Sequence, residues 1–231
     1  MSFNSYEKKV GSQNGEAGLI EYIFKVAGEQ SKTCVEFGVG SEFNCANQIG
    51  NHEWSAFLFD CDKVEVIKML VRYYNQPKVK VAEEHFTKEN INGKFVEHKV
   101  PAEIDLLSID VDGIDLYLWN TLNVTDARFV VVEYNSSLGT ERSVTVKYNP
   151  DFDRFKLHPE YYGASLQALT KVAQRKGMKL IGTDASGTNA FYAKQNEPFK
   201  EQTVEEAFHL HYGRNWRASI KYLEQYGFEE I

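Results

Sequence analysis

Apolar residues follow two alternating patterns along the chain: short continuous runs, and longer stretches in which they recur at helical spacing. The continuous runs predict five strands, over residues 33–37, 55–60, 77–82, 104–110 and 128–133. The helical spacing predicts helices over residues 16–29, 62–75 and 115–122. In the second helix, Val66, Leu70 and Tyr73 or Tyr74 form one apolar stripe. Strands separated by helices indicate right-handed crossovers and a mainly parallel sheet with helices on both faces.

The last third of this pattern predicts a helix over residues 162–176, ended by Gly177, and two strands over 178–182 and 189–194. The link between these two strands is too short to contain a crossover helix, so they should form an antiparallel hairpin at the sheet edge. The predicted fold class is therefore α/β, a doubly wound, mainly parallel sheet with an antiparallel edge hairpin.

The length of 231 residues suits one domain over residues 1–231. Within it, residues 134–161 lack any periodicity and form an insertion rich in Tyr, Asn, Ser and Asp. Long segments of this kind in compact domains are usually functional or disordered, and the aromatic residues argue against disorder. The final residues, 200–231, are expected to form a helical tail.

Composition and charge exclude several classes of protein. The 26 Lys and Arg residues against 33 Asp and Glu give a net charge of −7, which makes a broad nucleic-acid-binding surface unexpected. The sequence has no apolar run of about 18 residues and no leader-like start, so we expect neither membrane insertion nor secretion. The cysteines (Cys34, Cys45 and Cys61) are odd in number and form no CxxC pair. They indicate reduced thiols in a cytoplasmic protein. The expected partner is a small molecule, with neither nucleic acid nor membrane, and the oligomeric state is left open.

Four acidic residues stand at the ends of four predicted strands, namely Glu36, Asp60, Asp110 and Glu133. In a parallel sheet all these ends lie on one edge, which is where ligands bind in such folds. One acidic strand end would be an ordinary solvated terminus, but four together predict a functional cleft.

The first of these strands leads into the turn Glu36-Phe37-Gly38-Val39-Gly40-Ser41, whose glycines let the backbone pass close to a ligand. Asp60 stands at the end of the next strand, where a carboxylate can accept hydrogen bonds from two ribose hydroxyls. NAD and S-adenosylmethionine both present a ribose there. A dinucleotide site requires G-x-G-x-x-G, but the third glycine position holds Phe43, and Glu42 would repel phosphate. The acidic turn instead favours a ligand with an ammonium and a sulfonium group.

With these motifs, residues 30–195 resemble the class I S-adenosylmethionine-dependent methyltransferases, in a subgroup that is largely uncharacterised. Val35-Glu36-Phe37-Gly38-Val39-Gly40 looks like the glycine loop of that family, Asp60 takes the place of its ribose-binding acid, and Asp110 that of the acid after the fourth strand. The resemblance implies a seven-stranded sheet whose last strand is antiparallel. It also implies S-adenosylmethionine as cofactor, held by Glu36 at the methionine ammonium, by Phe37, Gly38, Gly40, Asp60 and Asp110, and by Glu83 and Glu84 near the adenine.

The spacing Asp110-x-Asp112, followed by Glu133-x-Asn135, places hard oxygen ligands on adjacent strand ends. Mg²⁺ favours such ligands and would lower the pKa of an acceptor hydroxyl, so Asp110 and Glu133 are candidate metal ligands and Asp110 and Asp112 candidate catalytic residues. The alternative is that Asp112 caps the following helix and Glu133 accepts a backbone N–H.

Candidate acceptor-binding residues are drawn mainly from the insertion and its borders: Glu133, Tyr134, Asn135, His158 and Tyr162. His158 is the candidate proton acceptor, with His85 as a second choice. The aromatic residues of the insertion could stack on a sugar or heteroaromatic acceptor, or form a small core that holds the insertion in place. His209 and His211 are expected on the C-terminal helix, where a spacing of two would point them to different faces.

These patterns predict an S-adenosylmethionine-dependent methyltransferase that acts on an oxygen of a sugar, a glycan precursor or a related metabolite. Two alternatives remain open, an NAD-dependent oxidoreductase and a non-catalytic binding subunit with the same fold.

Overall fold

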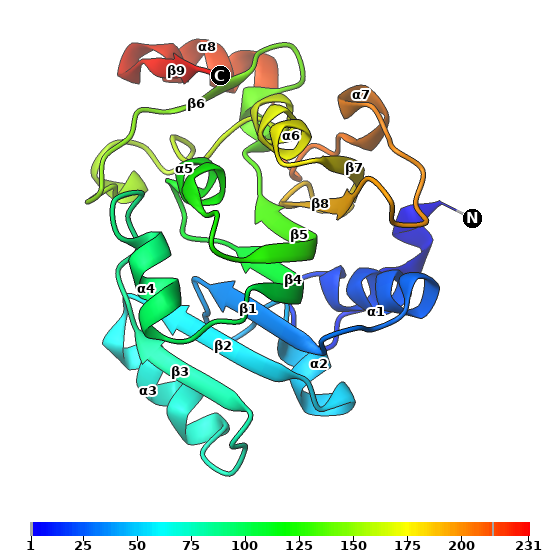
Figure 1. Cartoon of the computed structure of the whole chain (residues 1–231). Coiled ribbons are helices and arrows are strands. Elements are labelled where there is room, and N and C mark those ends of the chain that lie inside the picture. Colours follow the sequence, from blue (N-terminus) through cyan, green and yellow to red (C-terminus); the bar gives the residue numbers. More distant parts are fainter. Residues whose placement is uncertain (1, 214) are drawn as a thin grey trace.

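A seven-stranded sheet crosses the molecule in the computed structural model, which describes residues 2–213 and 215–231 (Figure 1). Its spatial order is β3-β2-β1-β4-β5-β8-β7. The strands are β1 Thr33–Phe37, β2 Ser55–Asp60, β3 Val79–Glu83, β4 Glu103–Ile109, β5 Asp126–Glu133, β7 Met178–Thr183 and β8 Asn189–Lys194.

The direction of the strands confirms the predicted fold class. The first five strands are parallel, while β8 pairs antiparallel with both β5 and β7. Glu133 at the end of β5 lies opposite Asn189 at the start of β8. The carboxyl ends of all five parallel strands therefore meet along one edge of the sheet.

Helices cover both faces of the sheet and enclose two apolar cores (Figure 1). The helices α1 Glu16–Ala27, α2 Ala46–His52 and α3 Lys63–Arg72 pack on one face, and α4 Ile91–Glu97, α5 Asp115–Thr121 and α6 Leu166–Arg175 on the other. The sequence did not predict α2 and α4, which have only seven residues each. In the described part of the chain no helix is both long and apolar enough to cross a membrane.

The predicted helix over residues 162–176 begins only at Leu166, because the residues before it are extended and Ala164 forms a β-bridge with Thr145. Ser165 then caps the helix through its side chain, which accepts a hydrogen bond from the Ala168 N–H at 3.2 Å.

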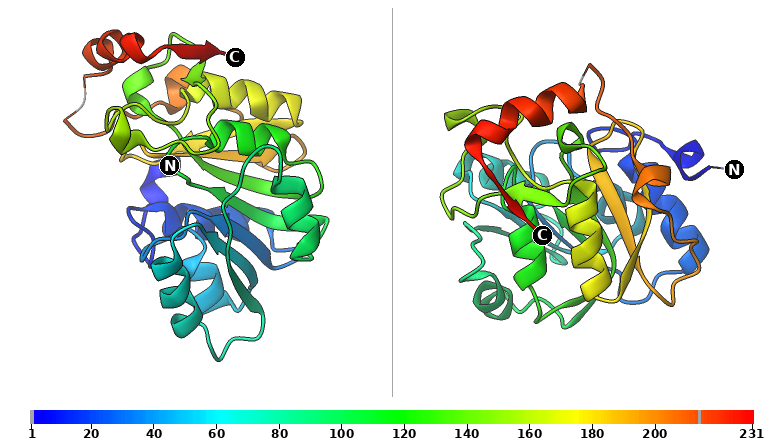
Figure 2. Two further views of the ribbon diagram at one scale, coloured as in Figure 1. Left: turned by 90° about the vertical axis from the view of Figure 1, so that its left-hand side faces the viewer. Right: turned by 90° about the horizontal axis from the view of Figure 1, so that it is seen from above.

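The C-terminal tail expected to be helical over residues 200–231 is only partly so. It contains α7 Val204–Ala207, α8 Trp216–Leu223, a short 3₁₀ turn at Glu224–Tyr226 and the strand β9 Phe228–Glu230. Gly227 has a φ of +74°, which ends the helical segment, and β9 then pairs antiparallel with β6 Val144–Val146 of the insertion. As Figure 2 shows, the tail lies over the insertion, and the two parts share an apolar cluster centred on Tyr161 and Leu223.

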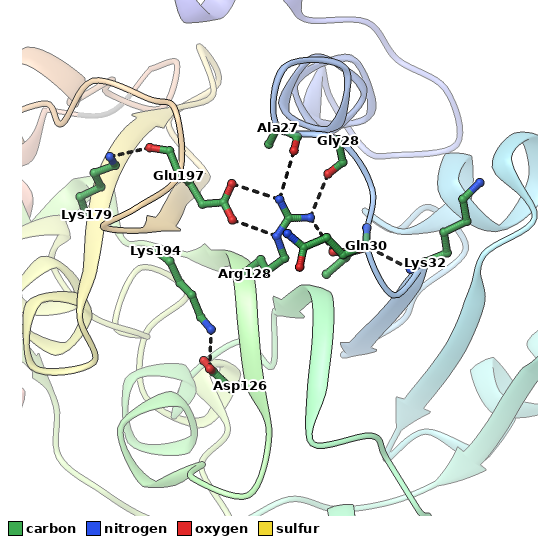
Figure 3. A network of polar contacts seen from close by, with 10 residues as sticks. Ala27, Gly28, Gln30, Lys32, Asp126, Arg128, Lys179, Lys194 and Glu197 are labelled. Atoms are coloured by element: carbon green, nitrogen blue, oxygen red, sulfur yellow. Dashed lines mark hydrogen bonds and ion pairs between the residues drawn. The ribbon is translucent and has the colours of Figure 1, made fainter.

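A buried ion network joins the amino-terminal ends of the central strands (Figure 3). Arg128 donates to Asp105 at 2.8 Å and to both oxygens of Glu197 at 2.8 and 3.1 Å. It also donates to the carbonyl oxygens of Ala27, the last residue of α1, and Gly28, the residue after it. The network fastens α1 and the β8 end to the sheet at the edge opposite the carboxyl ends of the parallel strands.

Candidate functional site

A cavity of about 610 Å³ opens along the carboxyl edge of the sheet. It is lined by the ends of β1, β2, β4 and β5, by the turn after β3, and by residues of the insertion near 150–154. Of the four acidic strand ends predicted from the sequence, Asp60, Asp110 and Glu133 line this cavity, and Glu36 lines a much smaller one beside it. The predicted cleft is therefore present at the predicted edge.

The glycine turn after β1 passes very close to the end of β4. Gly38 has a φ of +83°, and a Cβ atom added there would lie 1.4 Å from the carbonyl oxygen of Asp110. Its N–H donates to the carbonyl oxygen of Phe59 at 3.0 Å. Only glycine fits both the backbone conformation and the space, so this residue allows the ends of three strands to converge on the cavity.

Glu36 is fully enclosed and holds the rest of this turn in place. Its carboxylate accepts hydrogen bonds from the N–H groups of Asn44 and Cys45 at 2.8 Å each, and from the Ser108 hydroxyl at 3.0 Å. Burial raises its pKa, while these hydrogen bonds partly oppose the rise. The contact of Glu36 with a ligand ammonium stays a prediction, and the structure adds a role in closing the turn.

The ends of β2 and β3 form one side of the cavity. Asp60 lines it and accepts the Asp62 N–H at 2.7 Å, and burial holds the pKa of Asp60 above its ordinary value. Glu84 also lines it, 2.7 Å from His98 Nε2. Burial raises the pKa of Glu84, but hydrogen bonds from His98 and Lys94 outweigh that effect and lower it. Glu83, predicted to lie near the adenine, is exposed and outside the described lining, because successive residues of a strand point to opposite sides.

Three carboxylates gather at the ends of β4 and β5. One oxygen from each of Asp110, Asp112 and Glu133 lies within 4.8 Å of the other two. Glu133 is only 7% exposed, and its Oε2 has no hydrogen-bond partner among the described residues. Burial and the neighbouring carboxylates raise the pKa of both Asp110 and Glu133 well above the usual range. A cation placed here would offset both the burial and the repulsion between the carboxylates, and would thus favour their ionised forms.

Asp112 does not cap the following helix, as the alternative interpretation supposed. The N-cap position of α5 is Ile114, and Asp115 instead fastens the preceding loop, since its carboxylate accepts the N–H groups of Val111 at 2.7 Å and Gly113 at 3.0 Å. Asp112 has a φ of +58° and pairs instead with Arg154 of the insertion, with Nη1 and Oδ1 2.7 Å apart. This ion pair draws the insertion over the acidic cluster.

The insertion supplies an aromatic wall to the cavity. Phe152 and Tyr162 both line it, and the guanidinium of Arg154 lies 4.7 Å from the centroid of the Tyr162 ring. Phe152 fits against Gly113, where a Cβ atom would lie 2.2 Å from the Phe152 ring. Other aromatic residues of the insertion, such as Tyr161, belong to the small core under the C-terminal tail. The small-core interpretation therefore holds for Tyr161, whereas stacking of Phe152 and Tyr162 on an acceptor stays a prediction.

Three predicted acceptor-side residues lie outside the described lining of the cavity. His158 packs 5.3 Å from the Tyr222 ring, and its Nδ1 accepts the Glu160 N–H at 3.1 Å. Tyr134 is buried and donates to the carbonyl oxygen of His209 at 2.6 Å. Asn135 is also buried and donates to the carbonyl oxygens of Glu160 and Tyr162. Their predicted roles stay untested, but in the structure their polar groups bind the backbone of the insertion and of the tail.

Two histidines do line the cavity, His85 and His211. His85 Nε2 lies 2.8 Å from the carbonyl oxygen of Pro150. His211 was expected on a helix, on a different face from His209, but residues 208–211 have no helical structure. The His211 N–H donates to the Ser136 hydroxyl at 3.0 Å, which fixes the tail beside the end of β5. No periodicity in the sequence signals this contact, since it joins residues far apart in the chain.

Among the comparisons with known proteins, only those with solved structures find similar proteins. No protein-family model and no curated sequence matches the chain. Among solved structures, it is similar to PKMT2 from Rickettsia typhi in complex with AdoHcy, at a TM-score of 0.51 and 10% identity. That match covers 80% of this chain and 54% of the other, so the chain spans about half of that relative.

Two further solved structures are similar to this fold. An O-methyltransferase family protein from Burkholderia thailandensis matches at a TM-score of 0.50 and 11% identity, over 80% of this chain and 58% of the other. The methyltransferase domain of bacterial CtHen1-C matches at 0.50 and 11% identity, over 78% of this chain and 96% of that domain. Together with the strand order and the antiparallel β8, these matches show that the chain has the fold of the class I S-adenosylmethionine-dependent methyltransferases.

Proposed function

We propose that the protein transfers a methyl group from S-adenosylmethionine to an oxygen of a small-molecule acceptor, of the class of sugars, glycan precursors and related metabolites. The observation that carries this proposal is the acidic cavity on the carboxyl edge of the sheet, entered by a glycine turn that only Gly38 can form. Carboxylates around such a turn favour a cofactor with two positive groups and disfavour a pyrophosphate.

The described residues fit the cofactor as follows. Gly38 and Gly40 line the cavity beside Asp110, where the methionine part would lie. Asp60 also lines the cavity, at the end of β2, and would accept the ribose hydroxyls. Phe37, Phe59 and Phe86 line the cavity between the ends of β1 and β3, where they offer apolar surface to an adenine ring.

Methyl transfer needs little covalent chemistry from the protein. The acceptor oxygen attacks the methyl carbon in line with the sulfur, the carbon–sulfur bond breaks, and the acceptor hydroxyl loses its proton. The protein aligns the two molecules and excludes water. Tyr162 and Phe152 offer flat apolar surface to a sugar ring, and His85 and His211 are the imidazoles within the cavity that could accept the proton.

A divalent cation, Mg²⁺ foremost, belongs to this proposal as a second component. Asp110, Asp112 and Glu133 would hold it, and the support is the buried Glu133 oxygen that lacks a partner among the described residues. When bound, such an ion would lower the pKa of an acceptor hydroxyl. Activity that falls in EDTA and returns with Mg²⁺ is the expected result, whereas full activity in EDTA would remove the metal from the proposal.

Calorimetric titration with S-adenosylhomocysteine and, separately, with NAD tests the cofactor. We expect binding of S-adenosylhomocysteine, loss of that binding in Asp60→Ala, and no binding of NAD. The matched control is Asp62→Ala, which removes a neighbouring carboxylate outside the described lining. Binding of NAD alone would favour an oxidoreductase. Binding of neither would favour a non-catalytic subunit.

A further inference from the structure

A second, much smaller cavity lies beside the glycine turn after β1. Its volume is about 20 Å³, which is room for one group of the size of a water molecule. Both this cavity and the large one are lined by Gln13, Gly38, Glu42 and Asp110. The two cavities therefore adjoin where the methionine part of the cofactor would lie. An ammonium group has about the size of a water molecule, so the small cavity can hold one.

The small cavity has an acidic wall. Its lining includes the carboxyl side chains of Glu16, Glu36, Glu42 and Asp110 and, among the described residues, no Lys, Arg or His. Such a wall favours a cation over an anion. The charge alone does not select the binding residues, because a carboxylate that already accepts several hydrogen bonds has little capacity for another donor.

Glu36, which the family resemblance places at the ligand ammonium, has little of that capacity left. Its Oε1 accepts the Asn44 N–H at 2.8 Å and the Ser108 hydroxyl at 3.0 Å. Its Oε2 accepts the Cys45 N–H at 2.8 Å, and the Cys45 thiol adds a weaker hydrogen bond. A carboxylate offers about four acceptor positions, and these donors fill them. Glu36 therefore serves to hold the turn.

Asn189, at the start of β8, presents an oxygen without a partner to the small cavity. The residue is only 3% exposed, and its Oδ1 has no hydrogen-bond partner among the described residues. The orientation of the amide is fixed, because its Nδ2 donates to Glu16 Oε1 at 3.1 Å and a carboxylate can only accept. A buried oxygen without a donor destabilises the protein, and a ligand that brings an N–H group offsets that loss.

Glu16 places a carboxylate beside that oxygen. It is the first residue of α1 and is fully buried. Its Oε1 accepts the side-chain amides of Asn14 at 3.0 Å and Asn189 at 3.1 Å. Its Oε2 accepts one N–H among the described residues, that of Asn14 at 2.7 Å. One acceptor position of Oε2 and two of Asn189 Oδ1 are therefore unfilled, and together they match the three N–H donors of an ammonium group.

We propose that Asn189 and Glu16 bind the methionine ammonium of the cofactor, while Glu36 positions the glycine turn. This assignment rests on the proposed S-adenosylmethionine site, since that cofactor brings the ammonium group. Recognition of the amino group then belongs to β8 and to the start of α1, two elements that no motif in the sequence connects with the cofactor. A water molecule is the competing occupant of the small cavity.

Calorimetric titration with S-adenosylhomocysteine and with its deamino analogue, which carries hydrogen in place of the amino group, isolates the ammonium contact. We expect the wild type to bind S-adenosylhomocysteine at least about tenfold more tightly than the analogue. Asn189→Leu removes the amide at similar side-chain size. In this variant the preference should fall below about threefold, because only the ligand with an ammonium group loses a partner. Affinity for the analogue should stay within about threefold of the wild type.

Glu16→Gln and Glu42→Gln form a matched pair, since each replaces one carboxylate of the small cavity by an amide of the same shape. Glu16→Gln should also lower the preference below about threefold. Glu42→Gln should keep the wild-type preference, because the Glu42 side chain is 44% exposed and pairs with Lys9 at 2.8 Å. Thermal unfolding of each variant establishes that it is folded.

Glu36→Gln separates binding of the ammonium from positioning of the turn. We expect it to weaken binding of both ligands by the same factor, because a loosened turn misplaces the whole cofactor. A loss confined to S-adenosylhomocysteine in Glu36→Gln, or an unchanged preference in Asn189→Leu, would overturn the assignment. A wild type that binds both ligands equally would reject the ammonium contact alone, whereas a wild type that binds neither would reject the proposed cofactor itself.

Discussion

The two glycines of the turn after β1 should respond very differently to the same substitution. Alanine at position 38 must adopt a φ of +83°, which costs about 1–2 kcal/mol for a residue with a Cβ atom. The distance from that Cβ to the Asp110 carbonyl oxygen must also open from 1.4 Å to the 3.4 Å at which ordinary contact begins, a displacement of about 2 Å. Gly40 has no such obstacle, since its nearest neighbour would be the Glu42 carbonyl oxygen at 3.9 Å.

A displacement of that size moves the end of β4 or the turn itself out of position around the cofactor. Misplacement by about 1 Å can cost a hundredfold in a site that depends on alignment. We therefore expect Gly38→Ala to weaken binding of S-adenosylhomocysteine by at least about a hundredfold, which corresponds to about 2.8 kcal/mol. Gly40→Ala should stay within about threefold of the wild type, because its Cβ enters open space.

Isothermal titration calorimetry measures both affinities, and a thermal unfolding curve for each variant separates lost binding from lost folding. The reasoning fails if Gly38→Ala binds as tightly as Gly40→Ala, because the close approach of the turn to Asp110 would then not shape the site. Equal weakening in both variants would also refute it, since the structure distinguishes the two positions only by conformation and space.

Arg128→Met should lower the free energy of unfolding, measured in denaturant, by about 3–5 kcal/mol, because two buried carboxylates lose their partner. Lys194→Met breaks a more exposed ion pair and should lower it by less than about 1 kcal/mol. Equal losses of stability in the two variants would contradict the difference in burial. Burial raises the pKa of Asp184 to about 7, so its contribution to stability is complete below about pH 4 and is lost as the pH rises through 7. Asp184→Asn should flatten that decline, and parallel stability curves for the two proteins between pH 4 and 7 would rule this out. His211→Asn should lower kcat at least about tenfold with little change in S-adenosylhomocysteine affinity, while His158→Asn, outside the cavity lining, should leave kcat unchanged; the reverse order would restore the sequence-based choice.

The sheet and its acidic edge could be predicted because their signals are local. Each central strand is a continuous apolar run buried on both faces, so a short window of sequence contains the whole signal. Crossover helices make the strands parallel, so their carboxyl ends lie on one edge, and the residue that ends each run must lie there. That is why Asp60, Asp110 and Glu133 were placed correctly without any knowledge of their contacts.

The acceptor side could not be predicted in the same way, because its contacts join distant segments. β6 in the insertion pairs with β9 at the end of the chain, and Ser136 holds His211. No window of sequence contains both partners of either contact. The interpretation of residues 200–231 as a helix followed from local propensity, and it gave no reason to expect His211 at the cavity. His158 is a residue type expected in an active site, but it lies outside the described lining of the cavity.

Helix α3 shows how a correct element can still carry one misassigned residue, since Val66 and Tyr73 are buried as predicted but Leu70 is 48% exposed. Its pattern contains apolar residues at nearly every angle around the axis, so a single stripe through Val66, Leu70 and Tyr73 could be drawn, although Leu70 lies on the exposed side. The buried face is selected by the sheet beneath, where Met69 and Val66 fit, and the sequence holds no information on that choice. The apolar residues of α3 therefore exceed what the sheet can cover, and Val64, Ile67 and Val71 remain exposed.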